Sequence, residues 1–194
     1  MRTLDPTRGD HILEAAACLF HKRRYHEVRM DDVASQAGVA KGTLYRYFQD
    51  KEALYLALIL SSMNRFIADV EPLMAESQPA AERLRTYVRR SAAFCERYPY
   101  FLDLVQRVEG TDDPERLAPL QEARQKLLAI VTEVIQQLDG TGRFRVPHPA
   151  LAAIAFVGII RQTFRFLPQP WPADLPDLLA DQFLFGVCPP AAVR

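Results

Sequence analysis

The sequence has few of the residues on which metal, cofactor and membrane sites depend. Its three cysteines, Cys18, Cys95 and Cys188, are far apart and form no CxxC pair, which argues against a disulfide framework or a zinc site. Only eight of its 194 residues are glycine, and none are clustered as a phosphate-cradling loop requires. The formal net charge of zero excludes a nonspecific polycation. No apolar run reaches the roughly 18 residues of a membrane span. We therefore expect a cytoplasmic protein with reduced thiols and no membrane partner.

The residue patterns of common enzymes are missing as well. The sequence contains no G-x-S-x-G, H-E-x-x-H or Walker motif. Its four histidines, His11, His21, His26 and His148, lack the spacing of metal ligands. The sequence therefore predicts a protein that is not an enzyme and that uses no cofactor and no metal.

What is present is helical periodicity. Of the 14 prolines, Pro6 is followed by none until Pro72, which leaves room for long helices between them. Apolar residues recur at the spacing of a helix, as in Ile12, Ala16 and Phe20, and alternating strand patterns are essentially absent. These patterns predict an all-α fold of about nine helices.

The segment 30–48 has the spacing of a helix-turn-helix. A short helix from Met30 to Ala37 is predicted to end at Gly38, because glycine suits the left-handed residue that closes a helix. A second helix, from about Lys41 to Phe48, follows three residues later. In this arrangement the second helix enters the major groove of DNA.

The second helix carries polar groups on the face predicted to point outward. Its cations and hydroxyls suit phosphate oxygens and base edges, and positions 41–48 contain no acid. Two short helices joined by a glycine also occur in α-proteins that bind no DNA, so the spacing alone leaves that alternative open. The outward residues are Lys41, Gly42, Thr43, Tyr45, Arg46 and Tyr47.

These residues resemble the signature of the TetR (tetracycline-repressor) family. The resemblance lies in Gly-Val-Ala-Lys-Gly-Thr-Leu-Tyr-Arg-Tyr-Phe at positions 38–48 and in Lys-Glu-Ala-Leu at positions 51–54, and it extends over roughly residues 8–60. It implies a homodimer whose two helix-turn-helix heads bind a palindromic operator, usually as a repressor. It also implies a C-terminal domain in which a small-molecule effector releases the DNA.

The resemblance assigns roles to the outward residues of the second helix. They lie near bases and phosphates, with Tyr45 and Tyr47 on phosphates, and Lys51 binds a phosphate at the start of the next helix. Two positions depart from the family. Ala40 stands where serine or threonine is frequent, so an N-cap hydrogen bond typically worth about 1 kcal/mol is missing. Arg29 stands before the first helix of the motif, where it replaces a capping phosphate contact by a charged one.

The N-terminus adds two further cations, Arg2 and Arg8. We expect them to form a flexible arm near the minor groove. A simply disordered terminus is the alternative.

A later helix, about 150–167, is apolar on one face and mixed on the other, with Gly158 in its middle. A surface helix would be polar there, so we expect a helix of a second copy to pack closely on this face. The last helix, about 174–187, would complete a four-helix interface. Alternatively, both helices form the core of a monomer. The predicted interface residues are Leu151, Ile154, Ala155, Gly158, Arg161, Gln162, Arg165, Leu179, Phe183 and Gly186.

Aromatic residues are concentrated in the same part of the chain. Nine of the 11 phenylalanines lie beyond residue 60. A cavity lined by them would favour an apolar or aromatic effector, although aromatic residues at helical spacing also form ordinary cores. The predicted lining residues are Phe66, Phe94, Tyr98, Phe101, Val105, Phe156, Ile160, Phe164 and Trp171.

Together these features predict a DNA-binding domain, residues 1–52, and a ligand-binding and dimerisation domain, residues 53–194. A helix from Asp50 to about Glu71, ended by Pro72, would link them and transmit effector binding as a shift between two states. The predicted function is a ligand-responsive transcriptional repressor that binds operator DNA as a homodimer. The alternative is a ligand-binding or scaffold dimer that has lost DNA binding.

Overall fold

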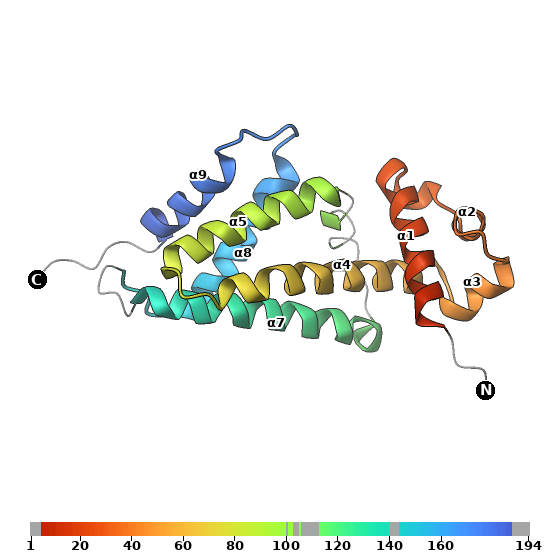
Figure 1. The fold of residues 1–194 in the computed structure, drawn as a ribbon, viewed down its shortest axis with the longest axis horizontal. Helices are drawn as coiled ribbons and strands as arrows, with labels where there is room; N and C mark the ends of the chain where they lie inside the picture. Colours follow the sequence, from red (N-terminus) through yellow and green to blue (C-terminus); the bar gives the residue numbers. More distant parts are fainter. Residues whose placement is uncertain (1–4, 100, 103–104, 106–112, 140–143, 188–194) are drawn as a thin grey trace, which may run out of the picture. The chain divides into compact units, whose positions relative to one another are not determined.

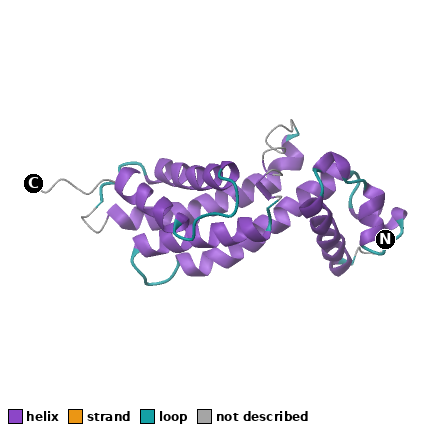
Figure 2. Ribbon diagram, turned by 90° about the horizontal axis from the view of Figure 1, so that it is seen from above, coloured by secondary structure: helices purple, strands orange, loops and turns teal. Residues whose placement is uncertain are grey.

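The structure, a computed structural model, describes residues 5–99, 101–102, 105, 113–139 and 144–187. These residues form eight α-helices and two short helical turns, and no strand element occurs among them (Figures 1 and 2). The all-α prediction is therefore confirmed, with eight described helices against about nine expected. Arg2 and Cys188 lie outside the described residues.

The chain forms two compact units. The first, called the head below, comprises Met1–Met63 and Tyr98–Leu120, and the second, called the body, comprises Asn64–Arg97 and Gln121–Arg194. The predicted domain boundary after residue 52 falls inside the head and stays a prediction. The segment Tyr98–Leu120 belongs to the head, although it is distant from the helix-turn-helix in sequence.

The head is built from short helices around a small core. Ile12 and Leu44 are fully buried, and the ring of Tyr55 lies 5.8 Å from that of Phe20 and 4.7 Å from that of Tyr25. The helix-turn-helix elements agree with the predicted ranges to within one residue at each end. The helices of the head are α1 (Pro6–Lys22), α2 (Met30–Gln36), α3 (Lys41–Tyr47) and the first turns of α4 (Lys51–Met74) and α7 (Pro114–Asp139), with a 3-10 turn at Tyr25–Glu27.

The body packs longer helices around a row of aromatic rings. Tyr87 lies 5.6 Å from Phe66 and 5.5 Å from Phe156, and Phe156 lies 4.6 Å from Phe183. Both α8 and α9 pack on α5 (Figure 1). The body contains α5 (Ala80–Arg97), α8 (Pro149–Phe166), α9 (Leu175–Gln182), a π-helical turn (Phe183–Val187) and the remainders of α4 and α7.

The long helix α4 begins as predicted and ends later than predicted. Asp50 caps its start, accepting a hydrogen bond from the Ala53 amide at 2.7 Å. The helix passes through Pro72 and ends at Met74 rather than Glu71. The buried guanidinium of Arg83 donates to the Met74 carbonyl at 2.5 Å, and a cation at a helix C-terminus stabilises that last turn.

By length and composition alone, α4 and α8 could span a membrane, contrary to the expectation from run length. In α4, 56% of the apolar window is buried inside the protein, as in the core helix of a soluble protein. In α8 only 22% of the window is buried. The exposed apolar face of α8 therefore needs a separate explanation.

Candidate functional site

The turn between α2 and α3 has the geometry that the sequence predicts. Gly38 has a φ of 61°, a conformation that other residues adopt only under strain. Ala40 precedes α3 and makes no side-chain cap, so α3 starts without the usual hydrogen bond. Leu44 and Phe48 are buried and anchor α3 to the head. The remaining residues of α3 are thereby turned outward.

The outward face of α3 is polar and open. Lys41, Gly42, Tyr45 and Arg46 are exposed, and Thr43 is half-buried. A Cβ placed on Gly42 would have no neighbour within 4 Å, so the protein itself does not require glycine there. Among the described residues Arg46 makes no ion pair, which leaves its guanidinium available to a phosphate or a guanine edge.

Acidic residues of α2 accept hydrogen bonds from two residues of the helix-turn-helix, one from a side chain and one from a backbone amide. Lys41 lies 2.8 Å from the Asp31 carboxylate, and the hydrogen bond between these side chains raises the pKa of the Lys41 ammonium. Arg29 is exposed, and its backbone amide donates to the Asp32 carboxylate at 3.1 Å. The Arg29 side chain is therefore not needed for capping α2.

Two residues predicted to bind phosphates make contacts within the head. The Tyr47 hydroxyl accepts a hydrogen bond from the Asp5 amide and donates one to the Asp5 carbonyl, both at 3.1 Å. The Lys51 ammonium donates to the Tyr25 carbonyl and lies 4.0 Å from the centre of the Tyr25 ring. These partners are distant in sequence, so sequence reasoning missed them.

The N-terminal arm prediction is wrong for Arg8. Asp5 caps α1 by accepting a hydrogen bond from the Thr7 amide at 3.0 Å, and α1 begins at Pro6. Arg8 therefore lies in the first turn of a helix, because this cap starts α1 earlier than the sequence pattern suggested.

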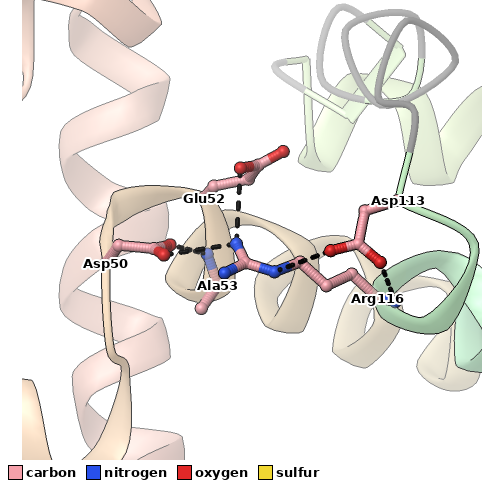
Figure 3. Close-up of polar contacts among 5 residues, drawn as sticks. All are labelled: Asp50, Glu52, Ala53, Asp113 and Arg116. Carbon is pink, nitrogen blue, oxygen red and sulfur yellow. Dashed lines mark hydrogen bonds and ion pairs between the residues drawn. The ribbon is translucent and has the colours of Figure 1, made fainter.

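Arg116 connects the starts of two helices within the head (Figure 3). Its guanidinium, at the beginning of α7, lies 3.2 Å from the Asp50 carboxylate and 3.4 Å from that of Glu52, both at the beginning of α4. It also pairs with Asp113, just before α7, at 3.2 Å. The Ala53 amide and Arg116 together lower the pKa of Asp50. The turn that follows α3 is thus tied to α7.

One face of α8 in the body is apolar and uncovered. Leu151, Ile154 and Phe166 are 63%, 56% and 71% exposed. Gly158 lies between them, and a Cβ added there would meet nothing within 4 Å. Ala155, Arg161, Gln162 and Arg165, also predicted for an interface, are half-buried or exposed. Exposed apolar residues gathered on one face are typical of interaction surfaces.

In the last helical segment, two residues predicted for the interface, Leu179 and Phe183, are buried in the body. The helix α9, which carries Leu179, packs on α5, and the ring of Phe183, at the start of the π-helical turn, lies 4.6 Å from that of Phe156. Leu178 and Phe185 are each 55% exposed instead, and Gly186 is exposed as predicted.

The predicted effector-lining residues fall into both units. Phe66, Phe156, Ile160 and Phe164 are buried in the body, with Phe94 and Trp171 half-buried beside them, as the ring distances of 5.0 Å (Phe66–Phe94) and 4.6 Å (Phe164–Trp171) show. Tyr98, Phe101 and Val105 belong to the head. Among the described residues, no group of three or more His, Cys, Asp or Glu could hold a metal ion.

Comparison with known proteins identifies related regulators. FasR, a transcriptional activator of Mycolicibacterium smegmatis, is 28% identical over 151 residues, which cover 78% of this chain and 68% of FasR. Other curated relatives match over about two fifths of their length. These relatives are transcriptional regulators, which supports the prediction that the chain is not an enzyme.

Two solved structures have the same fold. FadR of Bacillus subtilis, in complex with stearoyl-CoA, superposes with a TM-score of 0.79 at 22% identity and covers 91% of this chain and 98% of FadR. AibR, in complex with isovaleryl coenzyme A and operator DNA, gives 0.74 at 24% identity over 94% of this chain and 99% of AibR.

Two family models cover most of the chain. The model of bacterial regulatory proteins of the tetR family matches residues 12–58, and that of the tetracyclin repressor-like C-terminal domain matches residues 77–166. The first spans the helix-turn-helix, and the second runs from just before α5 to the end of α8. The chain belongs to the TetR family of transcriptional regulators.

Proposed function

We propose that this protein is a homodimeric, operator-binding repressor in the cytoplasm that an acyl coenzyme A effector releases from DNA. The observation that carries the proposal is the open face of α3, where Lys41, Tyr45 and Arg46 are exposed while Leu44 and Phe48 fix the helix in the core. A short helix held in this way can enter the major groove, and its cations and hydroxyls can bind phosphates and base edges.

The proposed DNA contacts divide into direct and supporting ones. Arg29, Lys41, Thr43, Tyr45 and Arg46 would contact DNA directly, and Gly42 would let a strand approach the backbone of α3. Tyr47 and Lys51 would act chiefly by holding Asp5 and Tyr25 in place, since both already donate to those residues.

A palindromic operator requires two heads, and the uncovered face of α8 supplies a surface for pairing. Its exposed apolar residues, with Leu178 and Phe185 of the last helical segment, would be costly to leave in water. A second copy of this chain fits the surface because a two-fold axis lets the same face serve both partners. Gly158, which no neighbour crowds, would allow the two α8 helices to pack closely.

The effector class is inferred from the two acyl coenzyme A complexes and from the apolar body. A thioester with a hydrocarbon chain needs an apolar environment for the chain, and the body contains a row of aromatic rings from Phe94 through Phe66 and Tyr87 to Phe156. We propose that an acyl chain binds against this row. The roles predicted for Ile160, Phe164 and Trp171 belong to the same proposal, whereas Tyr98, Phe101 and Val105 lie in the head and their predicted roles stay predictions.

Arg116 offers a physical route for the effector's signal. It joins the first turn of α7 to the first turn of α4, three residues after α3 ends. If acyl coenzyme A binds better to a state in which the first turn of α7 is displaced, the ion pairs would move α4 and the adjoining recognition helix with it.

Selection of DNA from a random duplex library tests the proposal. We expect enrichment of a palindrome, and tight binding of one protein dimer to it at 0.15 M salt. Stearoyl-CoA or isovaleryl-CoA should then weaken this binding at least tenfold, while coenzyme A alone should not. Absence of any enriched sequence would contradict operator binding. An acyl-CoA that tightens binding would contradict the repressor assignment alone.

A further inference from the structure

The head contains a cleft beside the recognition helix. Its volume is about 500 Å³. One wall is the start of α1, and the other is the α2–α3 turn together with the first turn of α3. The lining residues are Asp5, Thr7, Arg8, His11, Ala37, Gly38, Val39, Ala40 and Thr43.

Hydrogen bonds fix both walls of this cleft. Tyr47, at the end of α3, holds the backbone of Asp5 through two hydrogen bonds at 3.1 Å. Asp5 in turn caps α1 at the Thr7 amide. On the other wall the left-handed Gly38 closes the turn, and the amide of Val39 donates to the Ala34 carbonyl at 3.0 Å. The cleft is therefore preorganised, and a ligand would lose little entropy in ordering it.

The polar groups of the cleft suit a singly charged anion. Arg8 supplies a guanidinium that makes no ion pair among the described residues, and His11, Thr7 and Thr43 supply further hydrogen-bonding groups. No acidic residue lies in the first turn of α1. The one carboxylate in the lining, Asp5, opposes a ligand of high charge, which favours a phosphodiester over a phosphate dianion.

We propose that this cleft binds a phosphodiester of the operator backbone next to the groove that α3 enters, with Arg8 as its charged ligand. The proposal rests on the proposed operator binding. It favours DNA over free phosphate because Thr43 lines the cleft and also lies on α3, so a strand beside the recognition helix passes the cleft. The contact positions the head and carries no sequence information.

The test compares charge-neutral variants in salt-dependent DNA binding. Loss of one phosphate contact lowers the slope of log K against log salt by about 0.9, so Arg8→Gln should weaken binding about fivefold at 0.15 M salt, equally for operator and unrelated DNA. The matched control is Lys22→Gln, which removes an exposed cation from the last turn of the same helix. It should change neither the salt slope nor the DNA affinity. Asp5→Asn keeps an N-cap side chain but removes the opposing charge, and should tighten binding severalfold.

Single methylphosphonate substitutions along the operator then identify the phosphate. At one backbone position the neutral linkage should weaken binding of the wild-type protein and abolish the difference between wild type and Arg8→Gln. A slope for Arg8→Gln equal to that of Lys22→Gln, a changed base preference, or a loss that no methylphosphonate removes would each overturn the proposal. Failure of the wild-type protein to bind any selected DNA would instead contradict operator binding itself.

Discussion

The head exposes charge where the body exposes hydrocarbon. The open face of α3 carries Lys41, Tyr45 and Arg46, whereas the open face of α8 carries Leu151, Ile154 and Phe166. Each surface contains a glycine, Gly42 or Gly158, that nothing in the protein requires. Under the proposed function, the first surface would approach a polyanion and the second an apolar partner.

The interiors of the two units differ in a corresponding way. In the head, polar contacts at helix starts connect distant segments, as in Tyr47–Asp5, Lys51–Tyr25 and Arg116–Asp50. In the body, aromatic rings pack at the centre, as in Tyr87 and Phe156, and ion pairs such as Arg89–Asp177 join the outer sides of the helices. We therefore expect changes of apolar area to act strongly on the body, whereas loss of one capping carboxylate should act locally in the head.

The largest effect is expected from a charge on the apolar face of α8. Ile154→Glu would place a carboxylate at the centre of the proposed interface, where pairing of the two copies would strip its hydration. Dissociation of the dimer would remove the bivalent attachment to a palindrome, and operator affinity should fall by about 10² to 10⁴. Analytical ultracentrifugation measures the dissociation of the dimer, and DNA titration measures the loss of operator affinity.

The control introduces the same side chain elsewhere in the body. Gln136→Glu on α7 lies at an exposed position outside this face and should leave assembly unchanged. A dimeric Ile154→Glu protein with a normal circular dichroism spectrum would show that the face of α8 is not the interface, and the contrast between the two surfaces would lose its functional meaning.

A smaller effect, with opposite signs in two assays, is expected at Gly42. Alanine there should raise the free energy of unfolding by about 0.5 kcal/mol, because glycine costs helix stability and the new Cβ meets no neighbour. The same Cβ would hinder a DNA strand, and a loss of about 1.4 kcal/mol corresponds to tenfold weaker binding. Urea unfolding measures the stability of Gly42→Ala, and DNA titration measures its affinity. Ser35→Ala, at an exposed position of α2, is the control for both. Unchanged DNA affinity would mean that no strand approaches this point.

The sequence predicts the helix-turn-helix well because its determinants are local. The spacing of Gly38, Leu44 and Phe48 fixes the turn and the buried side of α3, and hence which residues face outward. The partners of Tyr47 and Lys51 are not local, since Asp5 and Tyr25 are brought to them only by tertiary packing. The phosphate roles of Tyr47 and Lys51, which the resemblance implies, stay predictions.

The last helical segment shows the same limit in the body. A helical wheel shows which residues of a helix are apolar. It does not show whether another helix of the same chain or a partner protein covers them. Here α5 covers Leu179, and the π-helical turn after α9 changes the phase, so that Phe183 points inward and Phe185 outward. The pairing of Arg85 with Asp181, which helps to hold α9 on α5, could not be found from a single sequence either.

The smallest effect tests whether acid loosens the head selectively. Asp50 caps α4 and pairs with Arg116, and these contacts hold its pKa below the ordinary value. Their stabilisation is present above the unfolded pKa, near pH 4, and is lost as the pH falls through the lower folded pKa. Asp50→Ala should therefore cost about 1 kcal/mol at pH 7 and progressively less below about pH 4. Hydrogen exchange of the Ala53 and Leu54 amides reports this loss in the head.

The matched control is Asp69→Ala, farther along the same helix, because Asp69 caps nothing and pairs only loosely with Arg90 at 3.9 Å. In the Asp69→Ala variant, the amides at the start of α4 should exchange at the same rate as in the wild type. Trp171, the single tryptophan, lies in the body, so its fluorescence follows the body alone. We expect Asp50→Ala to leave the Trp171 unfolding transition unchanged. If that transition shifts as much as the Ala53 exchange, the two units unfold together, and polar capping in the head stabilises the body as well.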